Sequence, residues 1–316
     1  DRMTEAATQA AAPAPRAGAV HPPRPGWLAS LLQRNEVLRG YVLLSPSLLV
    51  MLAFMAIPFG VMVAMSFWTP AGFDFDTTFS LGNYEAILTQ PIYGALLERS
   101  LLISGAATVT TVLLCYPMAY YVAFHVERHK TLWLILMTLP FWTSYLLRVF
   151  AWKLVLGYNG MVNASLTGIG LVDQPLEFLL YSPTAVVITL THAWAAFAIL
   201  PMYVSLEKID RSLLEAATDL GDGPWERFFR VTLPLSMPGV IAAMLLIFIP
   251  TVGDYVTPAL LGGPDGMMIG NLIQLQFGRA NNWPMGAALA IVMMASVAAV
   301  FVVTKLVARA AGAREA

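Results

Sequence analysis

Six long apolar stretches limit what this chain can fold into more than any other feature. They cover roughly residues 41–67, 101–125, 131–156, 184–206, 237–260 and 284–307. A helix needs about 20 mostly apolar residues to cross the hydrocarbon core of a bilayer, and each stretch is long enough. The alternating pattern of a membrane β-barrel is absent from the sequence. We therefore expect an all-α membrane protein in which residues 40–308 form one domain of six transmembrane helices.

The composition excludes several other classes of protein. Hydrophobic residues make up 58% of the 316 residues and charged residues 12%, whereas soluble domains average roughly 45–50% and 25%. The net charge of −1 gives no basic surface for nucleic acid. The single cysteine, Cys115, and the scattered histidines show no spacing that would hold a metal. We expect no metal site and no catalytic residue in this chain.

The distribution of Lys and Arg predicts the orientation in the membrane. If the N-terminus lies inside, four of the 18 Lys and Arg residues fall outside the inner segments: Arg99, Arg148, Lys153 and Arg279. Basic residues accumulate on the cytoplasmic side of membrane proteins. We therefore expect a multi-pass protein whose N- and C-termini are both cytoplasmic.

The two ends of the chain are expected to lie outside the membrane domain. Residues 1–39 are rich in Ala and Pro and lack the apolar core of a signal peptide, which predicts a partly disordered cytoplasmic tail. Residues 26–40 carry Trp and Leu near helical spacing, which fits a short helix on the membrane surface; a polar linker fits the same residues. Residues 309–316 are expected to form a cytoplasmic C-terminal tail.

One polar segment separates the fourth apolar stretch from the fifth and carries its own helix signals. Ser212 and Glu215 fit a capping box, which predicts that a short helix begins near Ser212. Gly221 suits the left-handed position that ends a helix. Pro224 suits the first turn of a second short helix, and Pro234 is expected to end it.

These two short helices would carry an apolar face. Its members are Leu213, Leu214, Ala216, Ala217, Leu220, Trp225, Phe228 and Phe229. Water disfavours such a face, so it needs a covering surface. Physical reasoning alone favours neither of two covering surfaces, a partner protein or the ends of the chain's own helices.

The same segment, residues 207–236, resembles the EAA motif of permease subunits of ATP-binding cassette (ABC) importers. The spacing fits without gaps, and Val231 stands where the family usually has Ile. The resemblance implies a type I ABC importer permease fold in which this segment is a cytoplasmic coupling loop that docks on the ATP-binding subunit. The residues it marks for coupling are Glu215, Ala216, Ala217, Gly221, Leu233 and Pro234.

The chain has no nucleotide-binding motif of its own. None of its lysines follows Gly and precedes Ser or Thr, so a P-loop is absent from the sequence. We therefore expect a subunit that is not an enzyme and binds no cofactor. The resemblance implies that a dimer of ATP-binding subunits binds ATP and Mg²⁺.

A wider resemblance, to permeases of spermidine/putrescine type, covers most of residues 40–308. It is carried by residues 139–157, 253–277 and 281–290. It implies a bacterial inner membrane importer with a second homologous permease and a periplasmic or extracellular solute-binding protein. The alternatives are another small cationic or amino-acid-like solute, an organic anion, a secondary transporter that works alone, and a membrane enzyme. A membrane enzyme would need clustered catalytic residues, and the sequence has none.

Asp254 is the only acidic residue deep within a predicted span. It lies between Pro250 and Pro258, which favour a broken helix, and freed carbonyls beside an acid are the kind of site that transporters use for cations. Our hypothesis is that Asp254 and Tyr255 line a cation pathway. Alternatively, Asp254 caps the broken helix or pairs with Arg148.

Three aromatic residues near the third apolar stretch are further candidates. Trp142, Tyr145 and Trp152 could hold an ammonium group through cation–π attraction. Aromatic residues near the membrane surface also serve as anchors at the headgroup level, and that interpretation stays open.

Overall fold

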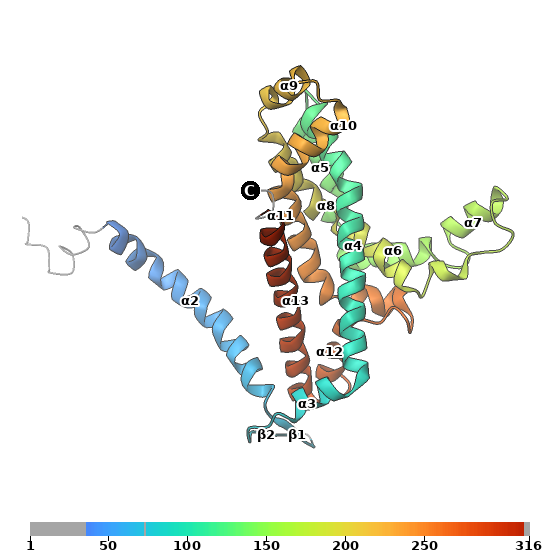
Figure 1. Ribbon diagram of the computed structural model, residues 1–316. Helices are drawn as coiled ribbons and strands as arrows, with labels where there is room; N and C mark the ends of the chain where they lie inside the picture. Colours follow the sequence, from blue (N-terminus) through green and yellow to red (C-terminus); the bar gives the residue numbers. More distant parts are fainter. Residues whose placement is uncertain (1–35, 73, 313–316) are drawn as a thin grey trace, which may run out of the picture. The chain divides into compact units, whose positions relative to one another are not determined.

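The computed structural model describes residues 36–72 and 74–312 (Figure 1). The chain divides into two compact units, residues 1–59 and 60–316. The predictions for the N-terminal tail up to residue 35 and for the last four residues lie outside the described residues. Of residues 26–40, for which the sequence left a surface helix and a polar linker open, the structure describes 36–40, and these belong to the first long helix.

That first helix, α2, runs over Glu36–Met65 and contains two prolines. Pro46 has no amide hydrogen, so the carbonyl of Val42 loses its helical partner. The hydroxyl of Ser45 donates to that carbonyl at 2.8 Å. A spanning helix tolerates proline when a nearby side chain satisfies the freed group in this way.

Four more helices are long and apolar enough to cross a membrane. They are α4 (Pro91–Phe124), α8 (Pro183–Glu207), α11 (Leu233–Val252) and α13 (Trp283–Gly312). With α2 they give five continuous candidate spans, and a bent helix pair brings the described number to six. By the length and composition of these helices, the prediction of an all-α architecture with six spans is confirmed.

The third predicted span is not one continuous helix. It consists of α5 (Lys130–Thr138), η1 (Leu139–Trp142) and α6 (Tyr145–Val155), and its two halves are bent by 84°. Thr143 and Ser144 take extended backbone between them. Because the chain leaves helical geometry there, the Pro140 carbonyl has no helical partner, and the Thr143 hydroxyl donates to it at 2.7 Å. This freed carbonyl is therefore satisfied locally.

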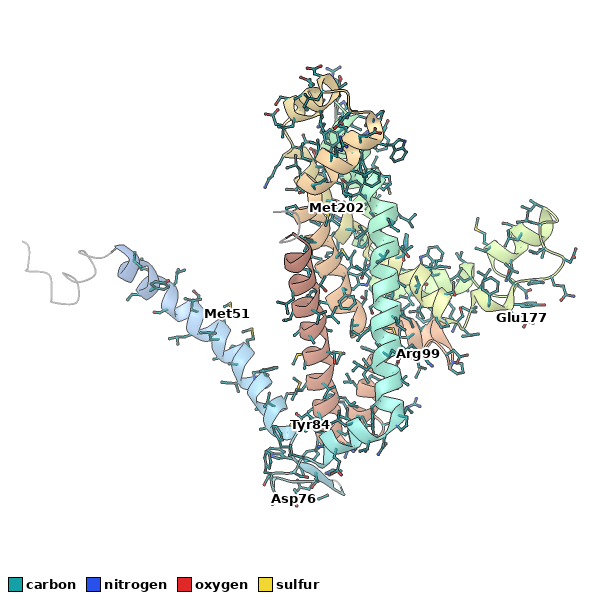
Figure 2. The ribbon with its side chains drawn as sticks, viewed as in Figure 1. Met51, Asp76, Tyr84, Arg99, Glu177 and Met202 are labelled. Carbon is teal, nitrogen blue, oxygen red and sulfur yellow. The ribbon has the colours of Figure 1, made fainter. Side chains whose placement is uncertain are left out.

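The core lies where α4, α8 and α11 pack together. Met202 on α8 is fully buried there (Figure 2). A β-carbon on Gly239 of α11 would lie 2.4 Å from the Cβ of Ser205 and 2.5 Å from the carbonyl oxygen of Pro201. Small residues allow membrane helices to approach this closely, so Gly239 sets the spacing of α8 and α11.

Helix α11 ends at Val252, eight residues before the predicted end of the fifth span. The chain then leaves helical geometry at Gly253 and Asp254 and makes a π-helical turn, η4 (Pro258–Gly262). It continues into α12 (Ile269–Phe277), which packs on α13. The sequence hypothesis of a helix broken beside Asp254 agrees with this backbone.

The remaining elements are short. The two strands form an antiparallel ribbon, the one β-sheet in the described ranges. The elements are β1 (Thr69–Ala71), β2 (Asp74–Asp76), α3 (Gly82–Thr89), α7 (Met161–Gly168) and η2 (Glu177–Leu179).

The polar segment between α8 and α11 forms α9 (Arg211–Asp219), α10 (Pro224–Arg227) and a π-helical turn, η3 (Phe228–Thr232). The predicted Ser212 capping box is wrong, because the cap is Asp210, whose carboxylate accepts from the Ser212 amide at 3.0 Å.

The two predicted helix ends in this segment have different outcomes. Gly221 has φ +93°, as predicted for a left-handed helix end. Its amide donates to Thr218, and the next amide donates to Ala217, which together make a Schellman motif. Pro234 was predicted to end the second helix, but the chain runs on through η3 into α11. Pro234 therefore lies where the π-helical turn passes into α11, in the first turn of that helix.

We predict that Gly239→Ala destabilises the protein by about 1–3 kcal/mol, because the new methyl group has no room between α8 and α11. Thermal unfolding of the detergent-solubilised protein measures this. Gly105→Ala on α4 is the matched control, since a β-carbon there meets nothing within 4 Å. Equal melting temperatures for the two variants would contradict the packing argument.

We also predict that Asp210→Ala speeds amide hydrogen exchange in the first turn of α9, whereas Ser212→Ala does not. The hydrogen bond from Ser212 lowers the pKa of Asp210, so the cap is complete above the ordinary carboxyl pKa and is lost as pH falls through the lowered one. Exchange measured by mass spectrometry tests both variants. Faster exchange in Ser212→Ala alone would show that Ser212, and not Asp210, caps α9.

Candidate functional site

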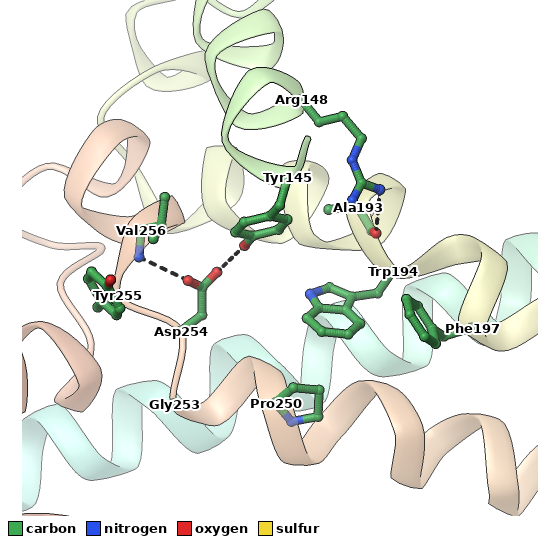
Figure 3. A pocket seen from close by; sticks show the side chains of 10 residues that line it. All are labelled: Tyr145, Arg148, Ala193, Trp194, Phe197, Pro250, Gly253, Asp254, Tyr255 and Val256. Atoms are coloured by element: carbon green, nitrogen blue, oxygen red, sulfur yellow. Dashed lines mark hydrogen bonds between the residues drawn. The ribbon is translucent and has the colours of Figure 1, made fainter. Parts of the chain in front are cut away.

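A cavity of about 440 Å³ lies beside the break that follows α11. Its walls come from α6, α8 and the residues between α11 and η4 (Figure 3). The residues that line it are Tyr145, Arg148, Ala193, Trp194, Phe197, Pro250, Gly253, Asp254, Tyr255 and Val256. Three of the residues predicted for the pathway, Tyr145, Asp254 and Tyr255, therefore meet in one place.

The Asp254 carboxylate is held by neutral donors. One oxygen accepts from the amide of Val256 at 2.9 Å, and the other accepts from the hydroxyls of Tyr145 and, at 2.7 Å, Thr257. The Tyr145 and Thr257 oxygens also lie 2.6 Å apart, so their two hydroxyl protons are shared among three contacts. The bond to Val256 is the cap that the sequence offered as an alternative to a pathway role. No Lys or Arg in the described ranges lies within 4 Å of this carboxylate.

The N-terminal end of α12 packs against the backbone of the loop that follows α11 and contains Asp254 (the Asp254 loop). A β-carbon on Gly270 would lie 2.7 Å from the carbonyl oxygen of Asp254, so the two backbones touch. The Asn271 side chain donates to the Tyr255 carbonyl at 2.8 Å. The Ile269 amide in turn donates to Ser100 of α4 at 2.7 Å. The position of the carboxylate thus depends on α12 and, through it, on α4.

Arg148 also lines the cavity, but it does not pair with Asp254, so that alternative is wrong. Its guanidinium donates to the Ala193 carbonyl at 3.1 Å and lies 4.5 Å from the centre of the Phe141 ring. Within the described part of the chain it has no carboxylate partner, and its Nε atom is buried without a hydrogen bond. The indole nitrogen of Trp194 is buried and unbonded in the same way.

Two predicted aromatic residues do not line this cavity. Trp142 precedes the break in the third span and is 84% exposed. Trp152 lies two turns along α6 from Tyr145 and packs edge-on against His192, with 5.4 Å between the ring centres. A helix rises about 10 Å in seven residues, so Trp152 shares the helix face of Tyr145 but lies about 10 Å further along α6.

Sequence reasoning missed Trp194 and Phe197. Both are on α8, three residues apart, which places them on one helix face. Their ring centres are 5.2 Å apart, and they form the wall opposite the Asp254 loop (Figure 3). The available signal was this three-residue spacing within an apolar stretch, which cannot separate a cavity wall from ordinary core packing.

The polar segment between α8 and α11 presents part of its predicted apolar face. Ala217 is buried, and the Phe228 ring lies edge-on to Tyr116 with 5.8 Å between centres, so these residues pack on the chain's own helices. Leu220, Trp225 and Phe229 are 88%, 72% and 58% exposed. The second group is an apolar surface at the end of α9, on α10 and on η3, which is typical of a protein interface.

The motif residues are split between this surface and the interior. Glu215, Ala216, Gly221 and Pro234 are exposed, and Leu233 is half-buried. Glu215 lines a smaller hollow of about 370 Å³ between α4 and α9 and has no ion-pair partner in the parts that the structure describes. Its predicted role in capping its own helix is not found, since Asp210 provides the cap.

Comparison with known proteins shows the family to which this chain belongs. Residues 27–312 match the family described as binding-protein-dependent transport system inner membrane component. The chain is 39% identical over 239 residues to the spermidine/putrescine transport system permease protein PotB of Haemophilus influenzae, covering 75% of this chain and 83% of that one. It is 36% identical over 241 residues to PotB of Escherichia coli K12, covering 76% and 87%.

Solved structures agree at the level of the fold. A bacterial ABC transporter involved in the import of the acidic polysaccharide alginate matches with a TM-score of 0.64 at 19% identity, over 88% of this chain and 96% of that one. The fold is that of an ABC importer permease of type I. On the family match and these relatives, the chain belongs to the inner membrane components of binding-protein-dependent transport systems.

Proposed function

We propose that this chain is one permease subunit of an ATP-driven importer of polyamines, with spermidine and putrescine as its cargo. The observation that carries the proposal is the 36–39% identity to spermidine/putrescine permeases over three quarters of the chain. The cavity beside Asp254 supports it, because an unpaired carboxylate among aromatic rings attracts an ammonium group.

The importer would be completed by other subunits. A second homologous permease encloses the pathway, and a periplasmic or extracellular solute-binding protein delivers the cargo. A periplasmic binding protein forms part of a solved complex of the alginate transporter, whose permease fold is similar. In this arrangement both termini and the segment between α8 and α11 lie in the cytoplasm.

A dimer of ATP-binding subunits would supply the energy and hold ATP and Mg²⁺. We assign its docking surface to the exposed side chains of Leu220, Trp225 and Phe229, next to Glu215 and Gly221. From this surface, one helical path over Pro224–Val252 leads directly to the Asp254 loop. A displacement of α9 and α10 by the ATP-binding subunit is therefore passed to the cavity by α11, which changes the side to which the cavity opens.

In the cavity, the ammonium group of the cargo would be bound at Asp254. Neutral donors hold this carboxylate, so an approaching ammonium replaces one neutral donor with a charged one without first breaking an ion pair. Such a site binds a cation and also releases it, as a transport pathway requires. The rings of Tyr145, Tyr255 and Trp194 provide faces for the alkyl chain and for cation–π contact.

The proposal is tested by uptake into liposomes that contain the assembled complex, its solute-binding protein and labelled spermidine or putrescine. Uptake that requires ATP is expected. ATP hydrolysis without uptake of either polyamine would keep the importer class and reject the cargo.

For Asp254→Asn we expect ATP-driven polyamine uptake to fall at least about tenfold, since a hydrogen bond to a charged group is worth about 1.5–3 kcal/mol. Thr257→Val is the matched control: it removes one neutral donor to the same carboxylate and should reduce uptake much less. Initial uptake rates at several polyamine concentrations measure both. Unchanged uptake in Asp254→Asn would remove this residue from the pathway.

For Gly221→Val we expect strongly reduced uptake, because φ +93° costs a side-chain-bearing residue about 1–2 kcal/mol and shifts the end of α9. The control is Gly170→Val, which ends α7 at φ +72° with the same kind of hydrogen bonds and equal space for a β-carbon. Uptake and ATP hydrolysis are compared in both variants. Equal losses would mean that Gly221 has a general role in folding and no special role in coupling.

A further inference from the structure

Arg148 is a cation within the apolar part of the molecule that has no anion beside it. It lines the cavity that holds Asp254, yet no carboxylate in the described ranges lies within 4 Å of its guanidinium. Its Nη1 atom donates to the carbonyl of Ala193, which comes ten residues after Pro183, the first residue of α8. That is about 15 Å along the helix, near the middle of a hydrocarbon core about 30 Å thick. An unpaired charge at that depth is costly, so the position implies a partner.

The Arg148 guanidinium has two nitrogen atoms left over for that partner. Nε is buried without a hydrogen bond, and Nη2 has no acceptor among the described residues. The N–H groups of these two atoms lie side by side and point the same way, which is the arrangement that binds both oxygens of one carboxylate. The group that Arg148 lacks is therefore an anion with two acceptor oxygens.

A second, smaller hollow of about 160 Å³ lies beside Arg148, between α6 and α8. The residues that line it are Arg148, Ala151, Trp152, Val155 and His192. None of them is acidic, and the volume is several times the roughly 30 Å³ of one water molecule, so an acidic side chain fits. On a neighbouring face of α6, Leu147, Phe150 and Leu154 are exposed. This side of the molecule therefore offers an unpaired cation, a hollow and an apolar surface to a neighbour.

The cargo and the lipids are both unsuitable sources of the anion. The ammonium groups of a polyamine have donors and no acceptors, and the positive charge of Arg148 repels them. A phospholipid phosphate lies outside the hydrocarbon core, whereas Arg148 bonds near the middle of α8. Asp254 lines the same cavity but is held by Val256 and Thr257 instead, and Figure 3 shows it apart from Arg148. The remaining source is a carboxylate on another membrane protein.

We propose that the second permease of the importer packs against the face formed by α6 and α8 and supplies a carboxylate to Nε and Nη2 of Arg148. The ion pair completes the wall of the cavity and cancels a positive charge that otherwise repels the ammonium groups of the cargo. Among the residues that line the cavity, Asp254 is then the one uncompensated charge. This inference rests on the proposed function, because it names what the partner permease contributes to the same transport cavity.

The test uses the assembled complex, in which Arg148→Lys places an amine where the guanidinium lies. Dicyclohexylcarbodiimide, an apolar reagent that enters membranes, joins an amine to a carboxylate when the two are in contact. Mass spectrometry then identifies the joined peptides. We expect the amine at position 148 to be joined to an acidic residue of the second permease.

Two controls accompany this cross-linking experiment. The Lys130–Glu207 ion pair, with 2.8 Å between Nζ and Oε1, is present in every sample and shows that the reagent works. Leu147→Lys is the matched control, because its side chain is turned about 100° around α6 from Arg148 and should not be joined to the same acid.

A second variant keeps Arg148 and covers the case in which Arg148→Lys does not assemble. Ala151 is exposed and lines the smaller hollow, so we replace it with the photoreactive residue benzoylphenylalanine. Illumination should join this residue to the second permease. Capture of phospholipid alone would identify the bilayer as the neighbour and overturn the inference.

Uptake separates the ion pair from a general packing role of Arg148. Arg148→Gln leaves the partner's carboxylate unpaired and should reduce ATP-driven putrescine uptake at least about tenfold, as expected for a lost charged hydrogen bond. Changing the cross-linked acid of the second permease to its amide as well should restore most of the uptake, because no unpaired charge then remains. Uptake in the double variant that is no better than in Arg148→Gln would contradict the ion pair.

Two cross-linking results would also overturn the inference. One is an amine at position 148 that is joined to Asp254 of this chain. The other is an amine that is joined to no acid of the second permease in a sample where Lys130 and Glu207 are joined. Failure of the proposed function is a separate outcome: the cross-link is measured without cargo, so a wild-type complex that imports no polyamine rejects the cargo and leaves this test unchanged.

Discussion

A polar backbone group that leaves a helix inside an apolar layer must find a new partner, and the candidate site depends on this constraint. The chain leaves helical geometry within predicted spans at Thr143 and Ser144 and again at Gly253 and Asp254. At the first break a threonine hydroxyl satisfies a freed carbonyl; at the second the Asp254 carboxylate binds a freed amide. Tyr145 begins the helix after the first break and donates to Asp254 at the second. The two irregular regions therefore stabilise each other and enclose the cavity between them.

The length of the apolar stretches was enough to predict the six spans, because the thickness of the bilayer fixes that length. The break in the third span could not be predicted in the same way. Pro117 and Pro201 remain inside unbroken helices, whereas Pro140 lies next to a break. The difference depends on how neighbouring helices and hydroxyl groups satisfy the freed carbonyls, and this is a property of the packed structure.

The candidate site could likewise be predicted only in part from the sequence. Asp254 was identified because an acid inside a span is rare and costly, and its position in an apolar stretch is visible in the sequence alone. Val256 and Thr257 are its neighbours in the sequence, but its partner Tyr145 comes from a helix more than 100 residues away, so spacing could not assign it. Tyr145 and Trp152 share a face of α6, yet one bonds Asp254 and the other packs on His192. In the 207–236 segment, Gly221 was predicted correctly from backbone geometry alone, whereas the capping residue depended on a choice between Asp210 and Ser212.

The helical path over Pro224–Val252 has no loop between the α9–α10 surface and the cavity. An α-helix turns about 100° with each residue, so one residue added or removed within α11 would rotate the Asp254 loop to a different side relative to α9 and α10. The function therefore constrains the number of residues between these two regions as strictly as it constrains the side chains of the two regions. Across related chains, α11 should accept changes of apolar side chain far more readily than any change of length.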